Sequence, residues 1–264
     1  DANGENGALL LEPSRANLVP YSEYFGAGWT QNSVTLDFGY LAPDGTNSAY
    51  KVTNNGSGTL TYTSLGIDET YSRSIYARTT SGTGTLSLLT YYGNTNNDFT
   101  ITEEWQRFEV SSVTTTTGEA SFYAVDFRDS VGLSEVIIWG AQAEPASYVS
   151  SYIPTMGTSE TRAADFGITN DVDTNQSEGT LFIDLDIDAN AGGTYDCILG
   201  LGDGSSGNRF GILRNDDNTI RVYMVTGGTS QVEFDTTQSS GRLKIGFAYK
   251  ANDAAIYVNG TQEL

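Results

Sequence analysis

The stretch Thr59-Leu-Thr-Tyr-Thr-Ser-Leu65 alternates polar and apolar side chains. Because successive side chains of a β-strand point to opposite faces of the sheet, this alternation predicts a strand with one buried face and one wet face. Comparable runs lie on either side of it, at Tyr71–Arg78, Thr85–Tyr91, Trp105–Val110, Ala120–Phe127 and Val136–Gln142. Clusters of Gly, Asn, Asp and Ser separate these runs, and no stretch has the apolar spacing of a helix. The sequence therefore predicts an all-β protein.

The alternation lapses between residues 150 and 177, where a proline and a glycine interrupt the pattern. Strand patterns resume at Gly179–Asp188 and continue to Ala255–Val258. We therefore expect two sandwich domains. An entry segment at residues 1–20 precedes the first, at 21–149, and a linker at 150–177 leads to the second, at 178–264.

The charge of the chain limits its partners. Its 264 residues include 13 basic and 33 acidic side chains and have a formal net charge of -20. Such a charge repels phosphate backbones and anionic lipid headgroups. No apolar run approaches the roughly 18 residues needed to cross a bilayer. We expect neither a nucleic-acid partner nor membrane insertion.

The composition also limits the chemistry. The chain has no histidine, which excludes Ser-His-Asp and Cys-His nucleophiles and zinc sites that contain histidine. Its one cysteine, Cys197, cannot form a disulfide within the chain, and the run Tyr-Asp-Cys-Ile-Leu-Gly around it predicts a buried strand. A glycosidase needs two carboxyl groups about 5–9.5 Å apart across a cleft, a spacing that sequence does not reveal. We expect a protein that is not an enzyme.

Two groups of motifs resemble a known module. The run Leu9–Glu23, followed by Trp29 and Ala42-Pro-Asp-Gly-Thr46, resembles the opening of a module common in bacteriophage tail and fibre proteins and in secreted marine bacterial proteins. The close of that module is similar to three runs of this chain, Trp139-Gly-Ala-Gln142, Ser151-Tyr-Ile-Pro-Thr155 and Thr161-Arg-Ala-Ala-Asp165. In such proteins the enclosed segment is similar to jelly-roll carbohydrate-binding modules, and a concanavalin A-like (laminin G-like) sandwich follows. The resemblance implies a jelly-roll β-sandwich followed by a second, partly represented concanavalin A-like β-sandwich.

The same resemblance implies a non-catalytic structural or adhesive subunit of an extracellular assembly, namely a phage tail fibre or virion appendage that binds glycan at the virion surface. Two alternatives stay open: a subunit of a bacterial surface filament or adhesin, and a glycan-binding fragment of a polysaccharide-degrading enzyme. The strand pattern of the second sandwich stops at Leu264. Since open strand edges pair readily with other chains, we expect a homo-oligomer or an assembly with neighbouring subunits.

The candidate glycan site is a loop with two aromatic residues. Tyr91 and Tyr92 run directly into Asn94, Asn96 and Asp98. Aromatic rings stack on the apolar face of a sugar, and amide and carboxylate groups bind its hydroxyls. The alternative is a tyrosine-rich sheet surface with an Asn-rich turn.

The three tryptophans, Trp29, Trp105 and Trp139, are interpreted mainly as packing residues.

A candidate calcium site lies in the second domain. Asp184, Asp186 and Asp188 alternate with apolar residues, so a strand would place all three on one face. Like charges on one face repel unless water or a cation intervenes. Calcium prefers oxygen ligands, and a solvated acidic face is the alternative.

Overall fold

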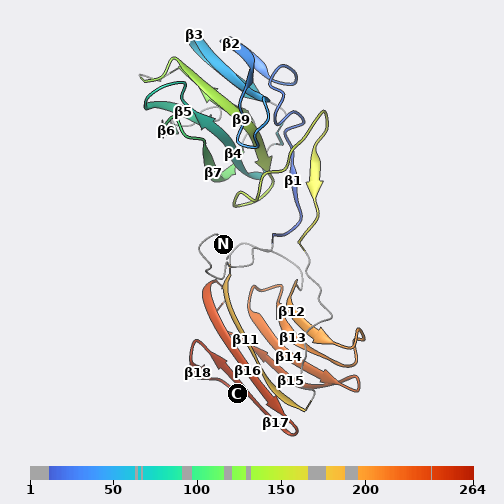
Figure 1. The fold of residues 1–264 in the computed structure, drawn as a ribbon. Helices are drawn as coiled ribbons and strands as arrows, with labels where there is room; N and C mark the ends of the chain where they lie inside the picture. Colours follow the sequence, from blue (N-terminus) through green and yellow to red (C-terminus); the bar gives the residue numbers. More distant parts are fainter. Residues whose placement is uncertain are drawn as a thin grey trace. The chain divides into compact units, whose positions relative to one another are not determined.

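The structure, a computed structural model, describes residues 12–62, 65–66, 68–90, 97–115, 121–128, 132–165, 177–187, 196–238 and 240–264. All regular elements in these ranges are β-strands, which confirms the predicted fold class. The strands form two compact units, residues 1–167 and 168–264. Figure 1 shows the strands of each unit. Among the described residues, no helix is long and apolar enough to cross a membrane.

Unit 1 is a β-sandwich whose two halves share one long strand, β3 (Ala49–Tyr62). Residues 50–53 of β3 pair with β9, and residues 59–62 pair with β8. The strand order is β6-β5-β8-β3-β9-β4-β7, with β2 paired to β3. The other strands are β2 (Thr30–Tyr40), β4 (Thr70–Arg78), β5 (Gly84–Thr90), β6 (Asp98–Ile101), β7 (Gln106–Thr114), β8 (Phe122–Asp126) and β9 (Glu135–Glu144).

One hydrophobic core joins the two halves of unit 1. Ile75 of β4 and Ile138 of β9 belong to the same buried cluster as Leu88 of β5 and Val125 of β8. Between the two pairing regions of β3, a Cβ atom on Gly58 would lie 2.3 Å from the carbonyl oxygen of Ser33. Only glycine fits there, since that distance is far inside van der Waals contact.

The tryptophans pack as expected. Trp29 is 7% exposed and belongs to the main core, and its Nε1 donates to the carbonyl oxygen of Tyr21. Trp139 is 5% exposed, and its ring centroid lies 4.7 Å from that of Tyr152. Trp105 is half-buried and donates to the carbonyl oxygen of Leu41.

The two ends of unit 1 meet in a structure that we name the clasp, made of residues 12–24 and 150–162. Strand β1 (Arg15–Asn17) pairs antiparallel with β10 (Glu160–Arg162). Asn17 is fully buried, and its Nδ2 donates to the carbonyl oxygens of Ala141 and Ile153, at 3.1 and 2.9 Å. Its Oδ1 accepts from the backbone N–H groups of Val19 and Ala143, both at 3.1 Å.

Further hydrogen bonds continue the clasp. The backbone N–H of Ser22 donates to Thr155 Oγ1 at 2.9 Å, and that of Thr155 donates to Ser22 Oγ at 2.8 Å. Gln142 Oε1 accepts from the N–H of Ile153 at 2.7 Å. The opening and closing motifs therefore lie together in space, where their polar side chains satisfy buried backbone groups.

The clasp contains residues that the sequence analysis assigned to the entry segment and to the linker, so the first domain is longer at both ends than expected. Residues 150–165, expected to begin a linker, pack and hydrogen-bond within unit 1, as do residues 12–20 of the expected entry segment. The prediction failed here because the segment has no alternation. Apart from the three-residue ladder between β1 and β10, its backbone is held mainly by side-chain hydrogen bonds.

Unit 2 consists of two four-stranded antiparallel sheets, ordered β11-β16-β17-β18 and β12-β13-β14-β15. Figure 1 shows the two sheets as separate layers. Their inner faces share one core, which contains Ile212 and Val222 from one sheet and Leu243 and Phe247 from the other. The strands are β11 (Glu178–Ile187), β12 (Asp196–Gly202), β13 (Arg209–Arg214), β14 (Ile220–Thr226), β15 (Thr229–Asp235), β16 (Gly241–Lys250), β17 (Asp253–Val258) and β18 (Thr261–Gln262). Unit 2 is thus a β-sandwich, and its concanavalin A-like character stays a prediction.

Cys197 lies in a strand, as predicted, but it is exposed rather than buried. It belongs to β12, which lies at the edge of its sheet. The register between β12 and β13 shifts between Cys197 and Leu199, which interrupts the alternation that would bury the thiol.

Candidate functional site

The predicted glycan loop lies mostly outside the described residues. Tyr91, Tyr92, Asn94 and Asn96 belong to that part of the chain. Asp98, the first residue of β6, is exposed, and its carboxylate accepts a hydrogen bond from Ser87 Oγ. The glycan role of these five residues therefore stays a prediction.

A polar network lies beside Asp98 on β5 and β8. Leu89 has a φ of 57°, a left-handed conformation that costs energy for a bulky side chain. Its neighbour Thr90 donates to Asp126 Oδ2 at 3.0 Å. Arg128 donates to both carboxylate oxygens of Asp126, at 2.9 and 2.5 Å, and its guanidinium carbon lies 4.6 Å from the centre of the Tyr123 ring.

Burial raises the pKa of Asp126, but hydrogen bonds from Arg128 and Thr90 outweigh it and lower that pKa below its usual value. Thr90 is 1% exposed and Asp126 is 4% exposed. Thr90 and the carboxylate of Asp126 are buried and satisfied by one another and by Arg128, whose own side chain is 45% exposed. This network therefore holds the sheet together rather than offering an unpaired carboxylate to a ligand.

A groove on unit 1 offers accessible groups instead. Its volume is about 500 Å³, within the range of about 300–1,000 Å³ usual for ligand sites. The clasp supplies most of its wall, β2 supplies one aromatic residue, and the residue before β3 supplies a hydroxyl. The lining residues are Glu23, Tyr24, Phe38, Ser48, Pro154, Thr155, Met156 and Glu160.

Two exposed aromatic rings form one wall of the groove. Phe38 is 63% exposed and Tyr24 is 45% exposed. Both rings contact the buried ring of Tyr50, with centroid distances of 4.9 Å for Phe38 and 6.2 Å for Tyr24. Tyr50 therefore supports both rings from behind, which fixes their positions at the surface.

A half-buried carboxylate, that of Glu23, also lines the groove. Glu23 Oε1 accepts a hydrogen bond from the Tyr152 hydroxyl at 3.0 Å, and that hydroxyl also lies 2.7 Å from Ser22 Oγ. Burial raises the pKa of Glu23, the hydrogen bond from Tyr152 partly offsets this rise, and the charge of Asp44 adds to it. Burial also raises the pKa of Tyr152. Glu23 is thus a fixed hydrogen-bond acceptor.

The hydroxyl group of Ser48 lines the groove as well. Ser48 Oγ accepts from Trp139 Nε1 at 2.9 Å and lies 2.6 Å from Thr46 Oγ1. Glu160 is exposed and adds a second carboxylate to the lining. The groove therefore combines two aromatic faces, two carboxylates and a hydroxyl, and its lining contains no lysine or arginine.

The predicted calcium residues lie partly within the described chain. Asp184 and Asp186 lie on the exposed face of β11, and Asp188 lies outside the described residues. Arg242 donates to both carboxylate oxygens of Asp184, at 2.9 and 2.7 Å, and Lys244 Nζ lies 3.8 Å from Oδ2. The hydrogen bond from Arg242 lowers the pKa of Asp184. Protein cations thus neutralise this carboxylate.

The described residues contain no group of three His, Cys, Asp or Glu side chains placed to hold a metal ion. The calcium site stays a prediction, since Asp188 belongs to the remainder of the chain.

Few features of the sequence point to the groove. Phe38 belongs to an alternating run, Val34, Leu36 and Phe38, that normally marks a buried face. In the structure Val34 and Leu36 are half-buried while Phe38 is exposed. Glu23 and Glu160 are far apart in sequence, and only the clasp brings them to one groove. The opening run Leu9–Glu23 ends on a residue of the groove, but its pattern does not mark Glu23 as a ligand-binding residue.

Comparisons with known proteins place the chain in no family. No family model matches it, and no curated protein matches it. A solved structure described as "CBM4 structure and function" aligns with a TM-score of 0.30 and 16% identity, over 44% of this chain and 86% of that chain. The enzymatically active domain of bacteriophage CBA120 tailspike protein 4 aligns with a TM-score of 0.30 and 11% identity, over 50% of this chain and 21% of that chain. Likeness at this level does not say what this chain binds.

Proposed function

We propose that the groove of unit 1 binds a neutral saccharide and that the protein is a non-catalytic, glycan-binding subunit of an extracellular assembly. The observation that carries this proposal is the placement of two supported, exposed aromatic rings beside a fixed carboxylate. Neighbouring exposed apolar rings beside polar groups are typical of ligand-binding surfaces. A sugar ring offers both an apolar C–H face for Phe38 and Tyr24 and hydroxyls for Glu23 and Ser48.

The charge of the lining favours a neutral ligand. Glu23 and Glu160 are both acidic, and Asp44 lies near enough to Glu23 to raise its pKa. A sulfate or uronate group would meet two carboxylates and no cation among the lining residues, and the chain as a whole is strongly acidic. Neutral sugars meet no such repulsion.

The wider role rests on the resemblance of the clasp motifs to phage tail and fibre modules. We propose a phage tail fibre or related virion appendage, located at the virion surface or outside the cell. The clasp itself is structural, so the glycan role rests on the groove and the assembly role rests on the resemblance. Catalysis is not part of this proposal, and we expect no release of reducing ends from any bound polysaccharide.

The proposal is tested by measuring retention of the full chain on a panel of immobilised neutral, sulfated and uronate-containing glycans. We expect retention on neutral glycans alone. Phe38→Ala and Tyr24→Ala should each weaken the strongest interaction by about tenfold, which corresponds to about 1.4 kcal/mol.

Leu41→Ala is the matched control, because Leu41 is also exposed, at 56%, but does not line the groove. Retention that is unchanged in both aromatic variants, or confined to acidic glycans, would contradict the proposal.

A further inference from the structure

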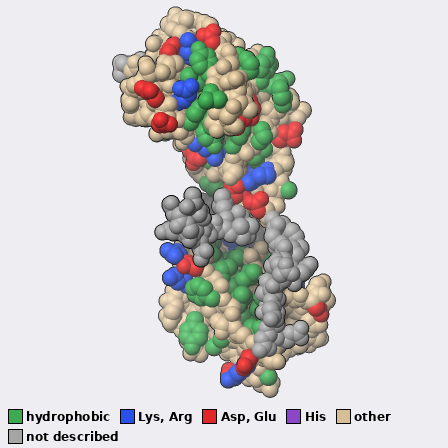
Figure 2. Space-filling model, in the orientation of Figure 1, with side chains coloured by type: hydrophobic (Ala, Val, Ile, Leu, Met, Phe, Trp, Pro, Cys, Tyr) green, Lys and Arg blue, Asp and Glu red, His purple; other side chains and the backbone are tan. Residues whose placement is uncertain are grey.

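The outer face of the sheet β11-β16-β17 in unit 2 carries an apolar band between charged rows. Phe182 of β11 pairs in register with Gly246 of β16, and Gly246 pairs with Tyr257 of β17. Phe182 is 63% exposed and Tyr257 is 41% exposed. These three residues thus form one row in which a glycine lies between two exposed aromatic side chains. Hydrophobic side chains also lie among charged ones on the face of unit 2 that Figure 2 shows.

The floor between the two aromatic residues is open. A Cβ atom on Gly246 would meet only the Cβ of Tyr257, at 3.8 Å, so no side chain covers the glycine. Two residues further along each strand, the same face carries Thr180, Ala248 and Ala255. Small side chains therefore continue the floor along β16.

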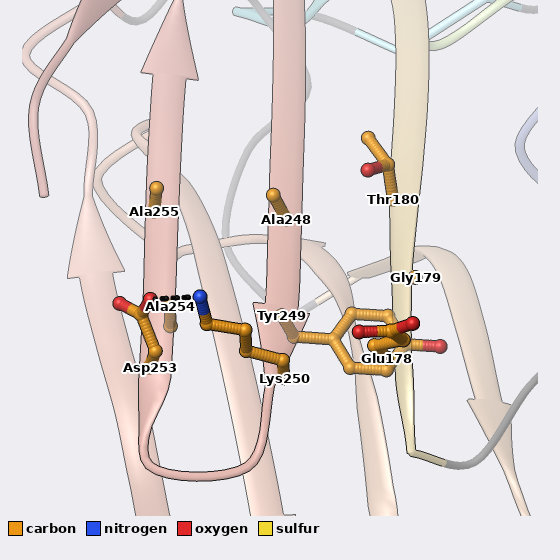
Figure 3. Close-up of a pocket in the computed structure, with 9 residues that line it drawn as sticks. All are labelled: Glu178, Gly179, Thr180, Ala248, Tyr249, Lys250, Asp253, Ala254 and Ala255. Carbon is orange, nitrogen blue, oxygen red and sulfur yellow. Dashed lines mark ion pairs between the residues drawn. The ribbon is translucent and has the colours of Figure 1, made fainter.

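A depression of about 350 Å³ begins at this second row and extends to the row of Glu178, Lys250 and Asp253, beside the row of Phe182, Gly246 and Tyr257. Figure 3 shows Thr180, Ala248 and Ala255 side by side on the three strands. Its far end is polar: Lys250 Nζ and Asp253 Oδ2 form an ion pair at 3.0 Å, and Glu178 lies on the neighbouring strand. We name this surface, from the row of Phe182 to the row of Lys250, the trough.

The spacing of the strands fits a single sugar ring. Neighbouring strands lie about 4.8 Å apart, so the backbones that carry Phe182 and Tyr257 are about 10 Å apart. Carbon atoms pack at about 3.5–4.0 Å, so a ring held between two aromatic faces needs about 7–8 Å. An extended peptide fits less well, because the backbone groups of β16 are already paired on both sides and offer it no ladder.

We propose that the trough binds one pyranose ring of a saccharide between Phe182 and Tyr257, with Gly246 as the floor. A ring clamped on both faces must present C–H groups on both faces. The preferred sugar therefore has all its ring hydroxyls equatorial, as glucose does, because an axial hydroxyl would press against an aromatic face. The polar groups at the far end, Lys250 and Asp253, can bind hydroxyls of the next residue.

This site goes beyond the proposed function, because it lies on the other unit and uses no residue of the groove. Its occupation would make the chain a two-site binder, in which the second contact adds avidity.

The test is an NMR titration of the full chain with a β-1,4-linked glucose hexamer, followed at the backbone amides of Gly246, Ala248 and Tyr257. We expect saturable shifts at these amides, which persist in the groove variant Phe38→Ala. A β-1,4-linked mannose hexamer, whose 2-hydroxyl is axial, should bind at least fivefold more weakly at the same amides. Shifts confined to the groove would support the proposed function and overturn this proposal.

Gly246→Val tests the floor directly. Valine is favoured in strands and has open space at this position, so the variant should fold normally while its side chain fills the trough. We expect the shifts at Ala248 and Tyr257 to disappear. Thr229→Val, at an exposed position of β15 in the other sheet, is the matched control and should leave them unchanged.

Unaltered shifts in Gly246→Val, equal binding of the two hexamers, or shifts that depend on protein concentration without any saccharide would each overturn the proposal. The last of these would identify a second copy of the chain as the occupant.

Discussion

The two units close their sandwiches by different means. In unit 1 the clasp brings together segments separated by more than a hundred residues, as when Asn17 donates to the carbonyl oxygens of Ala141 and Ile153. In unit 2 consecutive strands pair as hairpins from β12 to β15 and from β16 to β18, and β11 adds to β16. The difference matters for function. The groove of unit 1 is built from its stabilising clasp, whereas the trough of unit 2 lies on a finished sheet.

We expect the largest loss of stability from a substitution that breaks the clasp. Asn17→Ala leaves two buried carbonyl oxygens and two buried N–H groups without their partner, at about 1–3 kcal/mol for each unpaired group. Because water can enter and compensate in part, we expect a loss of about 4–5 kcal/mol from the stability of unit 1. Hydrogen exchange should show lost protection in β9, with the core of unit 2 unchanged. Equal loss of protection in both units would contradict this account.

In unit 2 the corresponding test removes apolar packing from the core rather than buried hydrogen bonds. Phe247 is fully buried, and its ring packs near those of Phe210 and Tyr249. Phe247→Ala should cost about 3–4 kcal/mol, because it leaves a cavity in a small core. The same exchange experiment should now show lost protection in β13 and β16 while the clasp stays protected. Saccharide binding at the groove should survive this variant, and its loss would show that the groove depends on unit 2.

A smaller effect on stability is expected at the ion pair of Asp126 and Arg128, and it should depend on pH. Hydrogen bonds from Arg128 hold the folded-state pKa of Asp126 below its unfolded value, even though burial opposes them. The stability from this pair is therefore present above the unfolded pKa, about 3.9, and is lost as pH falls through the folded value. Asp126→Asn should cost about 1 kcal/mol at pH 7, since Arg128 is half-exposed, and progressively less as the pH falls through the folded pKa of Asp126. A cost that does not change with pH would argue against the ion pair.

The smallest expected effect is a gain in stability rather than a loss, and it concerns Glu23. Burial raises the pKa of Glu23, so ionising this carboxyl costs stability as pH rises from its ordinary value through its folded value. Glu23→Gln removes that cost and keeps an acceptor for Tyr152. We expect a slightly higher melting temperature of unit 1 at pH 7 and no change at pH 3.5. A lower melting temperature at pH 7 would mean that the charged hydrogen bond to Tyr152 outweighs burial.

The sequence predicted the elements better than their connections. Alternation located strands such as β3 and β11, because apolar and polar residues alternate along a strand that has one buried and one exposed face. The clasp has no periodic pattern in the sequence, because Asn17, Ser22 and Thr155 act through side-chain hydrogen bonds to distant backbone groups. The groove was missed for the same reason. Its aromatic residue Phe38 lies in an alternating pattern that usually indicates burial. Its two carboxylates, Glu23 and Glu160, lie near opposite ends of the sequence of unit 1.

The groove of unit 1 is where we expect a neutral saccharide to bind. The most direct measurement is a crystal structure of the full chain grown with the glycan that the immobilised panel retains most strongly. We expect a sugar ring against Phe38 and Tyr24, with a hydroxyl within hydrogen-bonding distance of Glu23 or Ser48. A glycan bound elsewhere on unit 1, with the groove empty, would contradict it.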